Sequence, residues 1–373
     1  MKPDYRIPTM SEVSALKWNG LNVVSTFSGC GGSCLGFRMA GYRSMWASEF
    51  IPAAAKTYSL NHPDTTLDTR DIRKVQPEDI LKHVPSGESV HVMEGSPPCA
   101  AFSMAGKRTK AWGQVKTYSD TKQRVDDLFS EFLRLVAGVQ PNVFVMENVK
   151  GLIGGASSGV LKDTLETMRA IGYRVEARLL DAQWLGVPQH RERVIFQGVR
   201  LDLNKSPAWP KPFPYRYSIR DVIPDDVMKN SYGPPFRTMK ANSTFFPASY
   251  NGNVFLDGDQ SDVSVDDKSS VVYVAGIGHA NFAMKGHPIS LDAPVPTILA
   301  HLDTIEKHIR RGWVTTRHRV SLEELRILCS FPSDFLLPGD AFAKQWERLG
   351  RAVPPLMMRA IAASIRDKIF QHV

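Results

Sequence analysis

The chain has 373 residues, of which 43% are hydrophobic and 23% are charged, and this composition excludes a disordered or fibrous protein. The net charge of +8 permits a polyanionic partner but does not require one. Four cysteines without a CxxC spacing exclude a disulfide scaffold and predict no metal site, and no apolar run approaches the ~18 residues of a membrane span. We therefore expect a cytoplasmic protein with no membrane partner.

Short apolar runs alternate with helical patterns through the first half of the chain. We expect strands over residues 21–27, 44–49, 89–94, 142–147, 175–180 and 193–199. We expect helices from a glycine-rich loop to about residue 40, and over residues 51–60, 125–139 and 160–171. This alternation predicts an α/β fold, in which a mostly parallel sheet carries helices on both faces and ligands bind at the carboxyl ends of the strands.

The alternation breaks near residue 204. Residues 206–217 are rich in proline and aromatic side chains, residues up to about 270 are polar and irregular, and a helical pattern returns over residues 354–370. We therefore expect a first domain over residues 1–203 and a smaller domain over residues 204–290. Residues 291–373 would complete the hinge and return to pack on the first domain.

The first predicted strand leads into a glycine-rich loop, residues 27–37. Glycine lets the backbone turn tightly and approach a ligand, although such loops also serve packing alone. Glu49 lies twenty positions beyond Gly29, where nucleotide-binding folds place an acid that accepts hydrogen bonds from a ribose. Asp71 on its own would be a loop acid or a helix cap, but here its carboxylate can accept from an adenine amino group. These features predict a ligand that contains adenosine.

A cysteine follows two prolines directly after the third predicted strand, within residues 95–103. Pro97 and Pro98 restrict the backbone, so they hold Cys99 stiffly on a loop at the strand end. A thiol placed in this way suits a nucleophile. The alternative is an inert buried thiol, which is the common fate of a free cysteine.

Three charged residues at strand ends are further candidates. Glu147 ends a predicted strand in an apolar neighbourhood, where a carboxyl group can donate or share a proton; the alternative is a salt-bridged glutamate. Arg191 and Arg193 stand two apart at the start of the last predicted strand, so they share a face unless the strand begins only at Arg193. Their planar groups suit carboxylates and phosphates, and the alternative is a solvated or salt-bridged pair.

In type, order and approximate spacing, these segments resemble the motifs of the cytosine-5 DNA methyltransferases of the bacterial or phage modification type. The resemblance covers residues 21–199 and again 294–363, where the matching segments are 296–298, 319–324, 331–335 and 349–355. It implies a Rossmann-like fold of the methyltransferases that use S-adenosylmethionine. Residues 201–290 occupy the place of the family's variable target-recognition region.

The resemblance implies S-adenosylmethionine as the cofactor. The residues that it assigns to cofactor binding are Phe27, Gly29, Cys30, Gly31, Gly32, Glu49, Phe50, Asp71, Ile72, Pro98, Arg351 and Ala352.

The resemblance also implies that Cys99, Glu147, Arg191 and Arg193 are catalytic. The thiolate of Cys99 would attack carbon 6 of a cytosine, and Glu147 would bind and protonate ring nitrogen 3. The two arginines would help to form the thiolate. A methyl group would then pass to carbon 5. Because carbon 6 is unreachable inside a stacked duplex, the base would be flipped out of the helix.

A basic segment, residues 107–124, follows the cysteine. Such a run is usually a solvated face, but beside a nucleophile that needs DNA it suits a mobile loop that closes on phosphates. The residues expected to contact double-stranded DNA are Ser103, Lys107, Arg108, Lys110, Gln189 and Thr297.

Three positions depart from the family pattern. Ser25 stands where the family usually has Asp, two residues before the Phe of the glycine loop. Ala100 replaces the usual Gln after the cysteine, and Arg351 replaces the usual Asn of the last motif. Arg351 could turn into solvent, pair with an acid or bind a DNA phosphate. A bolder hypothesis is that it accommodates a cofactor analogue that bears an extra carboxylate.

The leading interpretation is methylation of cytosine in a specific duplex DNA site by a monomer. It would act in a bacterial cell or a phage-infected host, associated with the nucleoid, either alone or beside a cognate restriction endonuclease. RNA methylation uses the same chemistry, but the long recognition insertion favours DNA. A non-catalytic DNA-binding relative is the third alternative, against which the presence of all four catalytic candidates argues.

Overall fold

A computed structural model describes residues 2–98, 115–118, 121–124, 128–153, 158–231, 269–275, 287–300, 305–311, 314–339 and 341–371. Cys99 and Ala100 lie outside the described residues, as do Ser103, Lys107, Arg108 and Lys110. Among the helices in the described ranges, none is both long enough and apolar enough to cross a membrane.

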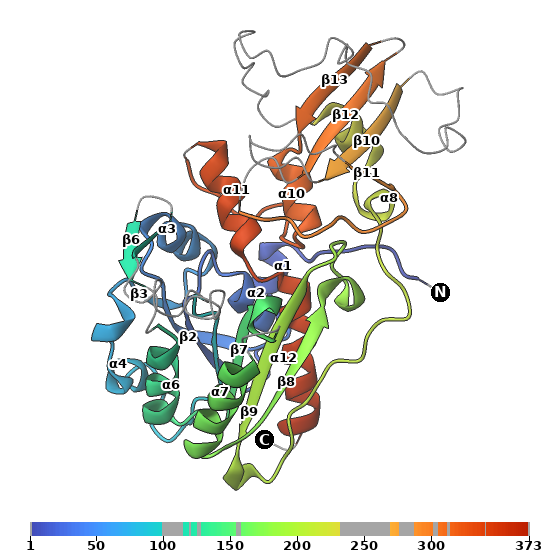
Figure 1. The fold of residues 1–373 in the computed structure, drawn as a ribbon. Coiled ribbons are helices and arrows are strands. Elements are labelled where there is room, and N and C mark those ends of the chain that lie inside the picture. Colours follow the sequence, from blue (N-terminus) through green and yellow to red (C-terminus); the bar gives the residue numbers. More distant parts are fainter. Residues whose placement is uncertain are drawn as a thin grey trace.

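The centre of the molecule is a seven-stranded sheet with the order β3-β2-β1-β4-β7-β9-β8 (Figure 1). Its strands are β1 (Asn22–Thr26), β2 (Arg43–Ser48), β3 (Thr66–Asp68), β4 (Val92–Gly95), β7 (Val143–Val149), β8 (Tyr173–Asp181) and β9 (Glu192–Arg200). Neighbours from β3 to β7 are parallel, whereas β9 runs antiparallel to both β7 and β8. The predicted mostly parallel α/β sheet is therefore confirmed, with one reversed strand.

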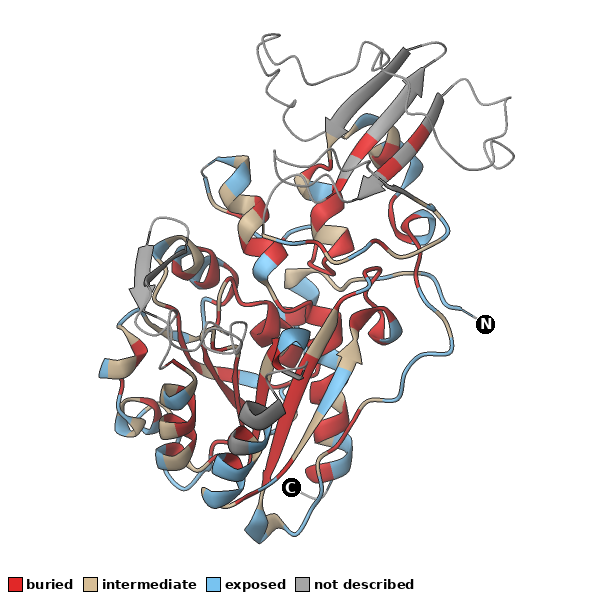
Figure 2. Ribbon diagram, viewed as in Figure 1, coloured by how far each residue is buried: buried red, intermediate tan, exposed pale blue. Residues whose placement is uncertain are grey.

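The side chains of alternate strand residues pack into two hydrophobic cores, one on each face of the sheet. Val23 lies in one core and Val24 in the other, because successive side chains of a strand point to opposite faces. Helices cover both faces (Figures 1 and 2). They are α1 (Met10–Ser14), α2 (Gly32–Met39), α3 (Pro52–Asn61), α4 (Pro77–Leu81), α6 (Leu128–Val139), α7 (Ser158–Ala170) and α12 (Pro355–Ile369). Short 3-10 helices span Ile72–Lys74, Lys150–Ile153, Ala182–Leu185 and Leu201–Leu203.

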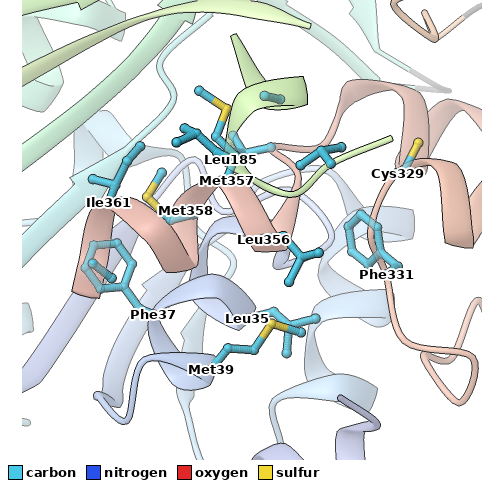
Figure 3. Packing of buried hydrophobic residues seen from close by; sticks show 14 of the residues in the cluster. Leu35, Phe37, Met39, Leu185, Cys329, Phe331, Leu356, Met357, Met358 and Ile361 are labelled. Carbon is cyan, nitrogen blue, oxygen red and sulfur yellow. The ribbon is translucent and has the colours of Figure 1, made fainter. Parts of the chain in front are cut away.

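The chain returns at its end to pack α12 against α2. Gly36 allows this close approach, because a Cβ atom there would lie 2.6 Å from both Met358 Cβ and the carbonyl oxygen of Pro355. Figure 3 shows Phe37 of α2 beside Met358 and Ile361 of α12 in the same apolar cluster. The predicted apolar face of the last helix is therefore buried against the helix that follows the glycine loop.

A second sheet of four antiparallel strands has the order β11-β10-β12-β13 and lies above the first in Figure 1. Its strands are β10 (Ser269–Ala275), β11 (His287–Ile289), β12 (Ile305–Arg311) and β13 (Val314–Arg319), so it takes strands from both sides of residue 290. The helices nearby in sequence are α8 (Ile219–Val222), α9 (Asp225–Asn230), α10 (Leu322–Leu328) and α11 (Phe342–Arg351). A separate hairpin joins β5 (Val115–Tyr118) to β6 (Thr121–Arg124) within the basic segment.

A buried ion pair fastens the second sheet to α10. Lys307 Nζ of β12 lies 2.7 Å from Glu324 Oε1, and both side chains are fully buried. The same ammonium donates to the carbonyl oxygens of Met228 and Ser231, and the Tyr273 hydroxyl donates to the Glu324 carboxylate. Four segments are thus held by one polar cluster, which is the arrangement that buried charges require.

Candidate functional site

A cavity of about 450 Å³ opens at the carboxyl ends of β1, β2, β4 and β7. Parallel strands bring their carboxyl ends to one edge of the sheet, and ligands of α/β proteins bind there. The predicted site residues that line this cavity are Phe27, Gly29, Cys30, Gly32, Glu49, Phe50, Ile72, Pro98, Glu147, Arg191, Arg193, Arg351 and Ala352. Thus residues far apart in the sequence share one cavity, and they include Pro98, the residue directly before Cys99 in the sequence.

The glycine loop forms one wall and starts α2. Phe27 and Gly29 have φ angles of 54° and 57°, in the left-handed region that non-glycine residues rarely adopt. Gly31, with φ of 92°, is the N-cap of α2 and lies against His62, whose Nε2 would be 2.2 Å from a Cβ atom at that position. Gly31 does not line the cavity, so its role is to turn the chain.

Glu49 follows β2 and ties the glycine loop to α3. Its Oε2 accepts from the Gly29 amide and its Oε1 from the Ile51 amide, each at 2.7 Å. Burial raises the pKa of this carboxyl, and the two backbone donors act in the opposite direction. Each carboxylate oxygen has a second lone pair, so Glu49 can also accept from hydroxyl groups of a ligand in the cavity.

Asp71 is placed differently from its neighbour Ile72. Its carboxylate accepts from the Arg73 amide as the N-cap of the 3-10 helix and pairs with the Arg73 side chain at 2.9 Å. Asp71 does not line the cavity, whereas Ile72 and Arg70 do. The helix cap that was the alternative for Asp71 is therefore present in the structure.

An ion pair also lines the cavity. Arg193 Nε lies 2.8 Å from Glu147 Oε1, and both side chains are only 12% exposed. Next along β7, the Asn148 amide donates to the carbonyl oxygen of Pro97 at 3.3 Å. This contact anchors the proline segment that precedes Cys99 to the strand that carries Glu147.

Arg191 precedes β9, is buried, and forms part of the cavity wall. Its guanidinium donates to the carbonyl oxygens of Ile298 at 2.9 Å and of Gly350 and Ala352 at 3.1 Å. Burial lowers its pKa to about 10, so it stays charged at neutral pH. Arg191 therefore joins the end of α11 to the segment around Ile298. Since the strand begins at Glu192, only Arg193 of the two arginines lies within it.

Arg351 ends α11 at the rim of the cavity. Its Nε donates to Glu347 Oε1 at 2.8 Å, one helical turn earlier, and its side chain is about half exposed. Pairing with an acid, one of the alternatives considered for this arginine, is therefore what the structure contains.

Sequence reasoning missed Glu94, which ends β4 and lines the cavity. Its side chain is buried, and Ser25, its partner in register on β1, donates to its carboxylate. Burial raises the pKa of Glu94 to about 7, against the opposite effect of the Ser25, Ser33 and Cys34 side chains. The available signal was an acid in the apolar run 90–95, five residues before the cysteine.

The remaining predicted DNA contacts divide into two groups. Gln189 is fully buried and its amide donates to the carbonyl oxygen of Leu328, so we propose no DNA contact for it. Thr297 is partly exposed and donates to the His190 carbonyl oxygen. Within the described ranges, no cluster of three His, Cys, Asp or Glu side chains could hold a metal ion.

Comparisons with known proteins show which family the chain resembles. A family model described as C-5 cytosine-specific DNA methylase matches residues 21–367. The chain is 31% identical over 352 residues to the Type II methyltransferase M1.HphI of Haemophilus parahaemolyticus, covering 92% of this chain and 86% of the relative. It is 27% identical over 366 residues to the Type II methyltransferase M.NgoPII of Neisseria gonorrhoeae, covering 96% and 99%.

A solved structure shares the fold. The DNMT2 protein of Spodoptera frugiperda, in a mutant form, superposes with a TM-score of 0.59 at 15% sequence identity. The similarity covers 94% of this chain and 100% of that chain. At this identity the likeness concerns the arrangement of the elements and not the residues of the site.

Proposed function

Because the chain belongs to the C-5 cytosine-specific DNA methylase family, we propose that it transfers a methyl group from S-adenosylmethionine to carbon 5 of a cytosine in a specific duplex DNA site. The observation that carries this proposal is the shared cavity. It brings together the glycine loop, Glu49, the Glu147–Arg193 pair and Pro98, the residue before Cys99.

The residues that line the cavity fit an adenosine-containing cation. A volume of about 450 Å³ is within the usual range for small-ligand sites. Glu49 offers oxygens to ribose hydroxyl groups, Phe50 and Ile72 offer apolar contacts, and the glycine loop allows close approach of the backbone. S-adenosylmethionine, when bound, supplies an electrophilic methyl group.

The chain's own residues make cytosine able to accept that group. The Cys99 sulfur forms a bond to carbon 6, and Glu147, held by Arg193, binds and protonates ring nitrogen 3. Carbon 5 gains the electron density that it needs to take up the methyl group. A base then takes the proton from carbon 5, the Cys99 sulfur leaves carbon 6 as a thiolate, and ring nitrogen 3 returns its proton to Glu147, which restores the aromatic ring.

Arg191 is a positioning residue in this proposal, because its guanidinium donates to backbone carbonyls of the cavity wall. The basic segment after Cys99, including Lys107, Arg108 and Lys110, would contact phosphates of the duplex around a flipped cytosine. We propose a bacterial cell as the setting, since the relatives are bacterial Type II methyltransferases. A restriction endonuclease that cuts the same site would then be a partner.

The bolder hypothesis of a carboxylated cofactor analogue gains no support from the structure. Arg351 already pairs with Glu347, so its charge is offset within α11. We therefore propose S-adenosylmethionine alone.

Expression in a bacterial host without cytosine-5 methylation tests the proposal. Sequencing of host DNA should reveal 5-methylcytosine at one recurring sequence motif with the wild-type chain. Cys99→Ser should abolish the mark while DNA binding is retained. Methylation of host RNA alone, or unchanged methylation with Cys99→Ser, would overturn it.

A further inference from the structure

Glu94 is a carboxyl group that the proposed reaction leaves without a role. It lines the cavity from the end of β4, five residues before Cys99, although its side chain is only 2% exposed. Its contacts in the described part of the chain come from neutral donors. The Ser25 hydroxyl donates to it, and the Cys34 thiol lies 3.6 Å from Oε1. A buried carboxylate is costly unless a positive charge approaches it.

Side chains from three elements act on the Glu94 carboxyl. β1 contributes Ser25, α2 contributes Ser33 and Cys34, and β7 contributes Glu147, whose charge repels that of Glu94. Burial raises the pKa of Cys34 to about 12, so this thiol stays neutral across the physiological range.

Two further side chains, Tyr58 and Arg193, do not bond to Glu94 but contact its neighbours Cys34 and Glu147. The Tyr58 hydroxyl of α3 donates to the Cys34 sulfur at 3.2 Å, and burial holds its pKa well above its usual value. Two acids, Glu94 and Glu147, lie here. Among the described residues, Arg193 is the only cation that bonds directly to either of them, and it bonds to Glu147. Glu94 is therefore the group that can change charge near pH 7 when a cation enters the cavity, since burial raises its pKa to about 7.

We propose that Glu94 is a specificity-determining residue that selects a sulfonium-bearing methyl donor over its uncharged thioether product. This inference rests on the proposed function, because it assumes that S-adenosylmethionine binds in this cavity. The donor carries one more positive charge than S-adenosylhomocysteine, and the two molecules are otherwise alike apart from the methyl group. When the donor binds, the Glu94 carboxyl loses its proton to the buffer and becomes the counter-ion of the sulfonium. The product, without that charge, leaves the carboxyl protonated and gains nothing from it.

The experiment measures the dissociation constants of S-adenosylmethionine and S-adenosylhomocysteine by calorimetry on the full chain without DNA, at pH 6 and pH 8. In the wild type, preference for the donor should rise about tenfold, because the ionised fraction of a group that titrates near pH 7 rises about tenfold over this interval. At pH 7, donor binding should release about half a proton, measured in buffers of different ionisation enthalpy, and product binding should release almost none.

Glu94→Gln keeps the size of the side chain and removes its charge. With this variant the preference should not change with pH beyond what the ligands' own amino groups cause, and proton release should disappear. Glu78→Gln, on the exposed face of α4, is the matched control and should behave as the wild type. The exchange Ser25→Glu with Glu94→Ser returns a carboxyl to the same paired position and should restore the pH-dependent preference.

The outcomes separate the two proposals. If the wild type binds neither molecule, the proposed cofactor is wrong. If it binds both and the preference is the same at pH 6 and pH 8, the cofactor stands and the role of Glu94 is overturned. Equal weakening of donor and product by Glu94→Gln would also overturn it, because that result would place the carboxylate against a group that both molecules share.

Discussion

Glu147 and Arg193 face each other across the antiparallel strands β7 and β9, with 2.8 Å between Glu147 Oε1 and Arg193 Nε. Glu147 is in register with Ile195, and Arg193 with Val149, so the two charged side chains are diagonal neighbours on one face. The reversal of β9 is therefore what brings an arginine to the proposed catalytic carboxylate. It also fixes the orientation of that carboxylate without using the segment that carries Cys99.

Glu147→Gln should lower kcat by about 10²–10⁴, which is the usual effect of losing a group that transfers a proton in the transition state. The amide keeps the shape of the side chain, so DNA binding should change little. Single-turnover methylation of a target duplex, together with a DNA-binding assay, measures both effects. Glu192→Gln, at the exposed pair with Lys150, is the control and should remain active. A Glu147→Gln enzyme with near wild-type kcat would contradict the assignment.

Arg191→Met should destabilise the protein by roughly 2–4 kcal/mol and weaken cofactor binding, because several buried carbonyl oxygens lose their donor. Arg191→Lys should not restore either property, since one ammonium group cannot reach acceptors on two separate segments. Denaturant unfolding and calorimetric titration measure the two effects. If the lysine variant had wild-type stability and affinity, positive charge alone would explain the role of Arg191.

Lys307→Met should cost about 3–5 kcal/mol of unfolding free energy, because it leaves the Glu324 carboxylate buried without its cation. The double variant Lys307→Met with Glu324→Gln should recover much of this loss, since the amide is neutral and can still accept from the Tyr273 hydroxyl. Denaturant unfolding of the wild type and the two variants provides the comparison. A double variant no more stable than Lys307→Met would show that the ion pair is not the cause.

Glu94 also makes stability depend on pH. Its pKa is raised from the usual 4.5 to about 7 by burial, so between these values the folded state binds more protons than the unfolded state. The stabilisation from the protonated carboxyl is present below pH 4.5 and is lost as pH rises through 7, with a total of about 3 kcal/mol.

Glu94→Gln should therefore gain stability relative to the wild type as pH rises from 5 to 8. Denaturant unfolding at several pH values, without cofactor, measures the difference between the two proteins. A difference that stays constant over this interval would contradict a carboxyl that titrates near pH 7.

The strands that position the site could be predicted from the sequence, but the direction of one strand could not. The apolar runs behind β1, β2, β4 and β7 are confirmed as neighbouring strands of a mostly parallel sheet. Side-chain periodicity contains no information on strand direction, so the reversal of β9 was not predicted. The short connection from Asp181 to Glu192 was the available signal, because a parallel crossover usually needs a dozen or more residues.

Long-range partners explain the other differences. The role of Arg191 depends on carbonyl oxygens more than a hundred positions away, which no local pattern reveals. Glu94 escaped notice because its burial depends on Ser25 of another strand. Ser25 itself was noticed only as a departure from the family pattern. The two positions together supply one carboxyl group, so the departure on β1 and the acid on β4 are two parts of one feature.

The central claim is that the Cys99 sulfur bonds to carbon 6 of a cytosine lifted from its duplex. Mass spectrometry of the intact protein, after incubation with S-adenosylmethionine and a target duplex that carries 5-fluorocytosine, tests it most directly. We expect an irreversible adduct that contains one DNA strand and a transferred methyl group, with its peptide mapped to Cys99, and no adduct with Cys99→Ser. An enzyme that methylates the ordinary duplex but forms no adduct with the fluorinated one, or forms it at another residue, would contradict the account.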